Sequence, residues 1–474
     1  MTQTVELPLW LFIVILLFAT VTAASHFLFP SVRWFLRRRA ERLVAELNKR
    51  LERPIQPFKL ARRTDMIQRL IYDPKVAEAI SDHAKETGLR EDVVFEQAKR
   101  YAREIVPGFS ATAYFGIAIR LARWLSTRLY DVRLGHHDAE QMKAIDADAT
   151  IIYVINHRSN MDYVLVTYLV AGQSALSYAV GEWARIWPLR PLIRALGGYF
   201  IRRRYRSPLY RRVLARYVQM ATTGGVMQAV FPEGGLSQDG RLASPKVGIL
   251  SYIVEDFDPE ARDVVFVPVA LNYDRVVEDT LLIEARKKGE KRFRGTIPSA
   301  LAFSLRYAWR RITGRARRFG VAAVSFGEPL SLRGSPGLRH APRVANELMH
   351  RIARVTPVLP VPLVCAMLEK AGGTISRVDM LEAISEASAA LGAGGAVLLL
   401  PGEAPEIVLD EALSHLILRK IVQDSDGLLS IFPGKEDLVT YYAGSILEVA
   451  DALAARPLPL DSSSEQGKSE LEET

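Results

Sequence analysis

Short apolar runs that end abruptly in polar residues recur through the middle of the chain. The first, residues 151–155, is rich in β-branched and aromatic side chains and has the length of a buried strand. Asn156 and His157 follow where this strand would emerge, and residues 163–170 are typical of the first turns of a helix. Ligands of open α/β sheets bind at such strand ends, so this stretch is a candidate site.

Three further runs repeat the pattern, and a fifth strand is expected at residues 321–326. The three lie at residues 196–204, 226–235 and 264–273. Pro268 interrupts the last of them and predicts an edge strand or a bulge there. Because strands alternate with helical patterns, the fold class expected for the centre of the chain is α/β.

The flanking regions are predicted to be helical, which gives the chain five segments. These are a transmembrane anchor (1–32), a helical N-terminal region (33–132), an α/β domain (133–332), a helical C-terminal region (333–458) and a disordered, Ser/Glu-rich tail (459–474). The C-terminal helices are expected at 344–355, 363–371, 377–390, 411–422 and 438–455.

The predicted anchor is a run without charge from residue 7 to residue 32. About 20 residues suffice to cross a bilayer as a helix. A cleaved signal peptide is the alternative, but Glu6 and no Lys or Arg precede the run, whereas a signal peptide begins with positive charge. Arginines crowd residues 33–42 instead, which predicts a single-pass protein of the cytoplasmic membrane with its main part on the cytoplasmic side.

A second apolar stripe lies at residues 117–130. Ile117, Leu121, Trp124 and Leu125 share one face of a predicted helix. Such a stripe can lie in a membrane interface, but packing against the core is the commoner arrangement and is the one we expect.

The chain carries a net charge of +9, which indicates an anionic partner such as a membrane surface, a phosphorylated substrate or nucleic acid. Its one cysteine, Cys365, excludes an intrachain disulfide framework and a Cys-rich metal site. The adjacent His136 and His137 are expected in a polar loop. No Gly-rich nucleotide-binding fingerprint is present, so neither a metal nor a resident cofactor is predicted.

The candidate catalytic pair is His157 with Asp162, five positions later. If the chain turns from strand to helix between them, the carboxylate can fold back under the imidazole, fix its tautomer and stabilise the imidazolium. A lone pair at this spacing is common by chance, and only the neighbouring strand ends make it a candidate. Ser159 could be proposed as a nucleophile, but capping of the following turn or helix is favoured.

Two other strand ends carry complementary groups. Arg202, Arg203, Arg204 and Arg206 follow the second run, and guanidinium groups bind phosphate bidentately. A solvated basic surface is the alternative and stays open. The third run ends at Glu233, where a glycine pair allows close approach of a ligand to the backbone. Glu233 can fix a hydroxyl group, or it can be a solvated carboxylate of the turn.

Taken together, the four stretches resemble the four motif blocks of the glycerolipid acyltransferase superfamily, over residues 153–328. His157-Arg158-Ser159, the run from Phe200 to Arg203 and Glu233-Gly234-Gly235 are similar to the blocks of membrane-bound bacterial glycerol-3-phosphate acyltransferases. The fold that this resemblance implies is a mixed β-sheet flanked by helices.

The resemblance also implies an activity, the transfer of an acyl group from acyl-CoA or acyl carrier protein to the 1-hydroxyl of glycerol 3-phosphate, the first step of phospholipid synthesis. His157 would be the general base and Asp162 its orienting partner. Membrane lipid would be a further partner, and nucleic acid would not. Substrate-binding roles are implied for the remaining block residues, namely Arg158, Ser159, Arg202, Arg203, Glu233, Gly234, Gly235 and Pro268.

One departure from the family pattern concerns the third block, where many members have two arginines at positions that are Leu236 and Gln238 here. Arg241, Lys246 or Arg204 could supply the missing phosphate contact. Dihydroxyacetone phosphate or lysophosphatidate are alternative acceptors, and a membrane-anchored lipid-binding protein without activity is the non-enzymatic alternative.

Overall fold

The computed structural model describes residues 41–181, 189–202, 207–289 and 318–454, with a few isolated positions before them. Two compact units are distinguished. The smaller comprises residues 1–55 and 172–174, and the larger residues 56–171 and 175–474. In the smaller unit, residues 41–50 are helical, and the N–H groups of Glu52 and Arg53 donate to the carbonyls of Gly172 and Gln173 at 3.2 and 3.0 Å. The sheet and the candidate site belong to the larger unit.

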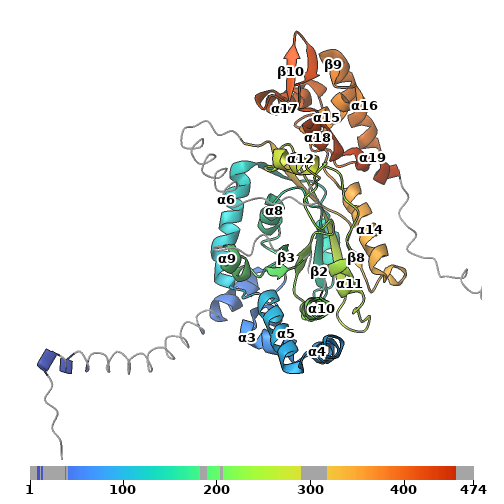
Figure 1. The fold of residues 1–474 in the computed structure, drawn as a ribbon. Helices are drawn as coiled ribbons and strands as arrows, with labels where there is room; N and C mark the ends of the chain where they lie inside the picture. Colours follow the sequence, from blue (N-terminus) through green and yellow to red (C-terminus); the bar gives the residue numbers. More distant parts are fainter. Residues whose placement is uncertain are drawn as a thin grey trace, which may run out of the picture. The chain divides into compact units, whose positions relative to one another are not determined.

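The larger unit is built on an eight-stranded mixed sheet (Figure 1). Along the sheet the order is β1 (Asp131–Leu134), β7 (Val321–Phe326), β6 (Val264–Tyr273), β2 (Thr150–Ile155), β5 (Gln228–Val230), β3 (Ser177–Gly181) and β4 (Tyr199–Ile201), and β8 (Leu330–Ser331) also pairs with β6. β7 and β8 run antiparallel to β6, and the other neighbours are parallel. The α/β class and the mixed sheet are therefore confirmed.

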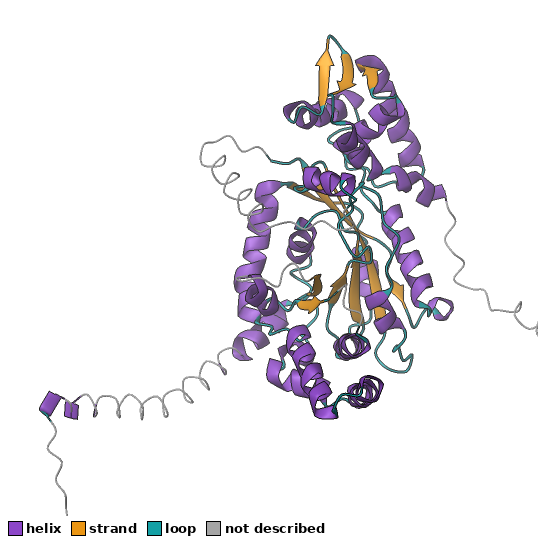
Figure 2. Cartoon of the chain, in the orientation of Figure 1, coloured by secondary structure: helices purple, strands orange, loops and turns teal. Residues whose placement is uncertain are grey.

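Helices cover both faces of this sheet (Figures 1 and 2). Along β2, Ile151, Tyr153 and Ile155 belong to one hydrophobic cluster, whereas Ile152 and Val154 belong to another. Alternate residues of a strand point to opposite faces, so β2 is buried on both sides, which explains its unbroken apolar sequence. Full burial of a Val or Ile side chain contributes about 1.5–3 kcal/mol.

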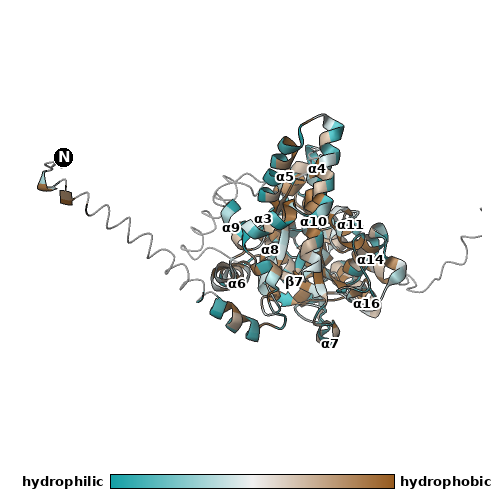
Figure 3. Cartoon of the chain, turned by 90° about the horizontal axis from the view of Figure 1, so that it is seen from below, coloured by the Kyte–Doolittle hydropathy of each residue, from teal (hydrophilic) through white to brown (hydrophobic). Residues whose placement is uncertain are grey.

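The first cluster is covered chiefly by α8 (Met161–Leu169), α12 (Asp279–Lys287), α15 (Pro360–Lys370), α17 (Pro405–Leu418) and α18 (Glu436–Gly444). The second is covered by α3 (Arg63–Ile71), α4 (Pro74–Thr87), α5 (Glu91–Ile105), α10 (Pro208–Thr223), α11 (Gly248–Val254) and α14 (Ala341–Arg354). α5 and α14 carry both hydrophilic and hydrophobic residues along their length (Figure 3), as expected of helices with one buried face. Shorter elements are α2 (Pro57–Leu60), α7 (Ala139–Ala144) and α9 (Leu189–Ala195).

The stripe at residues 117–130 differs from its prediction. It forms a π-helix (Thr112–Ala118) continued by α6 (Ile119–Leu129). Ile117, Leu121 and Trp124 are exposed, and α6 buries Ala122, Ser126 and Leu129 instead. The predicted packing against the core therefore holds only for Leu125, which is partly buried against the core cluster, and is wrong for the other three residues of the stripe.

The C-terminal region is mainly helical, as predicted, with a small sheet that the sequence did not indicate. It contains a 3-10 turn (Pro336–Leu338), α14, α15, α16 (Arg377–Ala393), α17, α18 and α19 (Leu447–Ala454). β9 (Thr374–Ser376), β10 (Val422–Ser425) and β11 (Leu428–Ile431) form the antiparallel sheet in the order β10-β11-β9. The single helix expected at 438–455 is two helices, α18 and α19.

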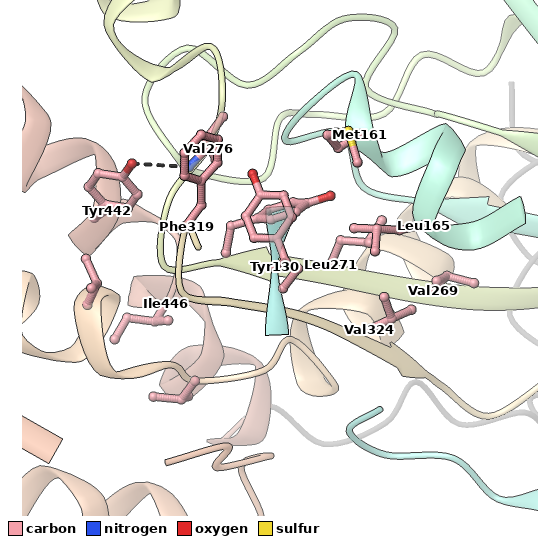
Figure 4. Packing of buried hydrophobic residues seen from close by; sticks show 14 of the residues in the cluster. Tyr130, Met161, Leu165, Val269, Leu271, Val276, Phe319, Val324, Tyr442 and Ile446 are labelled. Carbon is pink, nitrogen blue, oxygen red and sulfur yellow. Dashed lines mark hydrogen bonds between the residues drawn. The ribbon is translucent and has the colours of Figure 1, made fainter. Parts of the chain in front are cut away.

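α18 packs against the end of the central strands. Figure 4 shows Tyr442 of α18 beside Phe319, Tyr130 and Val276, and its hydroxyl accepts the Val276 N–H at 3.2 Å. Ile446, two residues after α18, belongs to the same hydrophobic cluster (Figure 4). The C-terminal region thus shares one hydrophobic core with the α/β region.

Within the described residues, no helix combines the length and hydrophobicity that a bilayer crossing requires. The anchor expected at residues 1–32 lies almost wholly outside the described residues, and so does the tail at 459–474. Both stay predictions.

Candidate active site

The site begins at the turn between β2 and α8. Asn156, the first residue after β2, clamps this turn to β6, because its amide nitrogen donates to the carbonyl of Leu271 at 3.0 Å and its amide oxygen accepts the Leu271 N–H at 2.7 Å. Residues 157–160 then lead into α8, which begins at Met161. The turn is therefore fixed to the neighbouring strand before the catalytic candidates are reached.

His157 and Asp162 meet as predicted, with 2.9 Å between Nδ1 of the imidazole and Oδ2 of the carboxylate. A carboxylate only accepts, so Nδ1 carries the proton and Nε2 presents a lone pair. Oδ2 also accepts the N–H groups of Arg158 at 2.8 Å and Ser159 at 3.0 Å, and Oδ1 accepts the Tyr273 hydroxyl at 2.5 Å. Four donors hold this fully buried carboxylate in one orientation.

Aromatic rings surround the imidazole. The ring centroid of Phe231 lies 4.2 Å from that of His157, and Tyr163 approaches edge-on at 5.5 Å. His157 is only 4% exposed. Among the described residues no hydrogen bond reaches Nε2, so this nitrogen is available to a bound alcohol in surroundings from which most water is excluded.

Glu233 is part of the scaffold of the site. Its Oε1 accepts the His157 N–H at 2.7 Å, and its Oε2 accepts the Ala243 N–H at 3.1 Å. Burial raises the pKa of Glu233 to about 7, although the positive charge of Arg158 acts in the opposite direction. Glu233 is therefore not a solvated carboxylate of the turn, as the alternative interpretation had it.

The loop after Glu233 returns to His157, since the Ser237 N–H donates to the His157 carbonyl at 2.9 Å. Gly234 has a φ of +70°, and a Cβ there would lie 2.8 Å from Cδ of Lys246, whose ammonium group donates to the Glu233 carbonyl at 2.9 Å. Gly234 is thus favoured by its backbone conformation, and a side chain there would also displace Lys246. A Cβ on Gly235 would meet nothing within 4 Å, so neither requirement explains it.

Ser159 stabilises the turn and is not placed as a nucleophile. Its hydroxyl donates to Glu278 Oε2 at 2.7 Å and accepts the Met161 N–H at 3.1 Å. Glu278 Oε1 accepts the side-chain amide of Asn160 at 3.0 Å, and burial raises the pKa of Glu278. Glu278, directly before α12, therefore holds the turn that separates His157 from Asp162.

Arg158 is buried and points to the C-terminal region, where Nη2 lies 3.4 Å from the Ser445 carbonyl. Within the described part of the chain, its Nε and Nη1 have no hydrogen-bond partner. The structure thus places Arg158 against the segment that follows α18.

Arg202 follows β4 and forms a bidentate ion pair with Glu104 of α5, with Nε–Oε1 and Nη2–Oε2 distances of 2.8 and 2.7 Å. These hydrogen bonds raise the pKa of Arg202 further. Arg202 is therefore not part of a freely solvated basic surface. Arg203, Arg204 and Arg206 lie outside the described residues.

A pocket of about 250 Å³ opens beside the Glu233 loop. Its polar lining includes the cations Arg202, Arg211 and Lys246, and its apolar walls come from β4, β5, α10 and α11. Phe231 both lines this pocket and packs on the His157 ring. The pocket therefore adjoins the candidate base through Phe231.

Pro268 lies inside β6, opposite Val154 of β2. The predicted edge strand is wrong, since β6 pairs with β2 on one side and with β7 and β8 on the other. β7 pairs with β6 from Val269 onward, β8 pairs only up to Phe266, and the Gly327 N–H donates to the Pro268 carbonyl at 2.8 Å. The missing N–H of proline thus falls where one partner strand has ended and the next has not begun.

Sequence reasoning placed Asn156 at the strand end without giving it a role, and it missed Tyr273, Glu278, Glu104 and Arg211. Asn156 and Tyr273 stand at the ends of recognised strands, which was the one available signal. The other three lie on or beside helices, and only the folded chain shows where their side chains point.

Two models of known protein families match separate parts of the chain. The model of the Acyltransferase family matches residues 134–272, which contain His157, Asp162 and Glu233. The model of the glycerol-3-phosphate acyltransferase C-terminal region matches residues 308–450. In these two regions the chain is similar to the glycerolipid acyltransferase superfamily.

Within this superfamily the chain is similar to glycerol-3-phosphate acyltransferases. It is 29% identical to that of Pseudomonas putida KT2440 over 326 residues, which are 66% of this chain and 38% of the relative. It is 32% identical to that of Pseudomonas entomophila L48 over 281 residues, 58% of this chain and 32% of the relative. It is 31% identical to that of Pseudomonas fluorescens Pf0-1 over 301 residues, 62% of this chain and 34% of the relative.

The matched part of the chain thus spans less than two fifths of the length of these relatives. The crystal structure of the 1-acyl-sn-glycerophosphate (LPA) acyltransferase from Thermotoga maritima covers 50% of this chain and 74% of that chain, with 21% identity and a TM-score of 0.32. Such a loose superposition does not inform the site.

Proposed function

We propose that the protein transfers a fatty acyl group from an acyl thioester to the 1-hydroxyl of glycerol 3-phosphate. The observation that carries this proposal is the His157–Asp162 pair, joined at 2.9 Å, beside a pocket lined by cations. The similarity to glycerol-3-phosphate acyltransferases supports the choice of acceptor.

The reaction needs one base. Nε2 of His157 takes the proton of the substrate hydroxyl while the alkoxide oxygen attacks the thioester carbonyl and forms the new C–O bond. The C–S bond then breaks, and the imidazolium returns the proton to the leaving thiolate. Asp162 stabilises the imidazolium in between, and general base catalysis of this kind contributes about 100- to 10,000-fold.

No acyl-enzyme is proposed, because a thioester is already activated and the candidate nucleophiles are committed elsewhere. The Ser159 hydroxyl donates to Glu278. Cys365 is fully buried, and burial raises the pKa of its thiol, which keeps it unreactive. Direct transfer between the two substrates is the simpler route.

The donor is an acyl-CoA or acyl carrier protein thioester, and Pro268, on the strand that carries Tyr273, belongs to the donor side in this proposal. The protein works at the cytoplasmic membrane, held by the anchor predicted at residues 1–32, so that the lipid product is released into the bilayer. The membrane location rests on the sequence of that segment.

The test uses the full chain in lipid vesicles with a labelled acyl-CoA and each acceptor in turn. We expect turnover with glycerol 3-phosphate, loss of turnover in His157→Ala with retained folding, and no change in the control His83→Ala on α4. Turnover with only lysophosphatidate or only dihydroxyacetone phosphate would replace the acceptor. Lipid binding without any turnover would favour the non-enzymatic alternative.

A further inference from the structure

Arg211 is a pocket cation that no sequence motif indicated. It belongs to α10, lines the 250 Å³ pocket and is exposed, so it stands at the opening of the pocket. Its guanidinium group has no hydrogen bond or ion pair with any residue that the structure describes. An arginine in this setting is available to an anionic ligand.

Arg202 differs from Arg211 although it lines the same pocket. Two of its nitrogens are taken by Glu104, whose side chain is buried. A guanidinium group binds phosphate best through two parallel N–H donors, and this ion pair already uses one such pair. Using Arg202 for a phosphate would mean sharing it with, or removing it from, a buried carboxylate, which is costly.

Lys246 lies on the same pocket wall as the Glu233 loop. Its ammonium group donates to the Glu233 carbonyl at 2.9 Å, which fixes a positive charge beside the residue whose side chain accepts the His157 N–H. A phosphate bound there would therefore be tied to the catalytic turn. Lys246 also supplies a positive charge to a loop in which Leu236 and Gln238, the positions of the family arginines, carry none.

We propose that the phosphate group of the acceptor binds at the opening of this pocket to Arg211 and Lys246, with Arg202 as a positioning residue that holds the end of β4 to α5. This inference rests on the proposed function for the identity of the ligand. In this proposal Arg211 of α10 makes the phosphate contact for which the third sequence block, with Leu236 and Gln238, has no arginine.

The pocket volume favours the acceptor over the donor. About 250 Å³ accommodates a three-carbon phosphate monoester but not a whole coenzyme A. The phosphate groups of coenzyme A offer the same chemistry, however, so the experiment must distinguish the two sources.

The first test needs no turnover. The full chain is treated with phenylglyoxal, which modifies accessible arginines, and the labelled positions are mapped by mass spectrometry with and without inorganic phosphate, glycerol 3-phosphate or coenzyme A. Arg212, the next residue of α10, is the matched internal control, because it is exposed but does not line the pocket. We expect glycerol 3-phosphate and phosphate to protect Arg211 and not Arg212.

Protection of Arg211 by coenzyme A alone would move the pocket to the donor, and protection by no ligand would overturn the inference. Equal protection of both arginines would show nonspecific ion binding and would overturn it as well. Protection of Arg211 in a protein that transfers no acyl group would leave this inference standing and remove the proposed function. The two can therefore fail separately.

The second test is kinetic. Arg211→Gln should raise the KM for glycerol 3-phosphate about tenfold or more, with kcat and the KM for the acyl donor unchanged, because a charge-assisted contact is lost from ground and transition state alike. Arg211→Lys should recover part of the loss, and Arg212→Gln should match the wild type. An acceptor KM that responds to Arg202→Gln in a stable protein, but not to Arg211→Gln, would return the phosphate to Arg202.

Discussion

Glu278→Gln tests whether a carboxylate outside the sequence blocks positions the catalytic turn. Glu278 receives the Ser159 hydroxyl at 2.7 Å and the Asn160 amide at 3.0 Å, and these two residues lie between His157 and Asp162. Glutamine has the same size but replaces one acceptor oxygen by a donor. Either Ser159 or Asn160 then faces a group that no longer accepts its hydrogen bond.

The expected effects on stability and on catalysis differ in size. Hydrogen bonds to a charged group contribute about 1.5–3 kcal/mol and neutral ones about 0.5–1.5 kcal/mol, so loss of the charge costs about 1 kcal/mol per contact. Removing a buried charge offsets part of this, since burial disfavours the ionised form of Glu278. We expect a net loss of unfolding free energy of about 1 kcal/mol. A displacement of about 1 Å in the turn, in contrast, is expected to lower kcat about 100-fold.

The assay is steady-state kinetics with both substrates, alongside denaturant unfolding of the same preparations. KM should stay within about twofold of the wild type while kcat falls, because the turn orients the base and does not bind the substrate. Glu284→Gln, an exposed carboxylate on the same α12, is the matched control. In a double-mutant cycle with Ser159→Ala the two kcat effects should overlap. A wild-type kcat in Glu278→Gln, or fully additive effects, would refute the positioning role.

Three further substitutions probe the same framework. Asp162→Asn should lower kcat by about 10,000-fold with the fold retained, as loss of the orienting carboxylate does in a catalytic triad, and an unchanged kcat would contradict the assignment. Tyr273→Phe removes a donor to Asp162 and should lower the unfolding free energy by about 1.5–3 kcal/mol in denaturant titrations, where no loss would mean that the contact is not formed. The pKa of Glu233 is about 7 in the folded state against an ordinary 4.5, so between pH 4.5 and 7 the folded state holds a proton on Glu233 that the unfolded state has lost. The unfolding free energy therefore falls by about 3 kcal/mol as pH rises from 4.5 to 7. Glu233→Gln lacks this dependence, so its unfolding free energy relative to the wild type should rise by about that amount from pH 4.5 to 7, and a constant difference would contradict the buried carboxylate.

The strands that begin a run of apolar residues and end in a polar motif could be predicted from the sequence, whereas β1 and β3 could not. β6 was predicted at its observed bounds and β2 to within one residue, because both are buried along their whole length and read as continuous apolar runs. β1 contains Asp131 and Arg133 in four residues at the edge of the sheet, and β3 contains only five residues ending in glycine. Neither has a pattern that distinguishes a strand from a loop, since their pairing is decided by the rest of the sheet.

The candidate site divides in the same way. The His157–Asp162 contact was predictable because both partners lie in one turn. Tyr273 and Glu278 reach the turn from 111 and 119 residues farther along the chain, and Glu104 meets Arg202 from 98 residues before it. A run of arginines predicts a phosphate site only if no carboxylate pairs with it. Whether a carboxylate does so is determined by the order of the strands and the packing of the helices, which the sequence does not show.

The C-terminal region bears directly on the loop that holds His157. A Cβ on Gly240, whose φ is +80°, would lie 1.7 Å from the Tyr441 carbonyl oxygen, and one on Gly444 would lie 2.5 Å from the Asp239 carbonyl oxygen. The loop and α18 therefore meet backbone to backbone, which only glycine allows at both positions. Ser445, one residue farther, accepts from Asn272 at the end of β6 at 3.2 Å. Because this loop also donates the Ser237 N–H to the His157 carbonyl, backbone contacts connect α18 to the candidate base, and the two matched family regions pack together at this site.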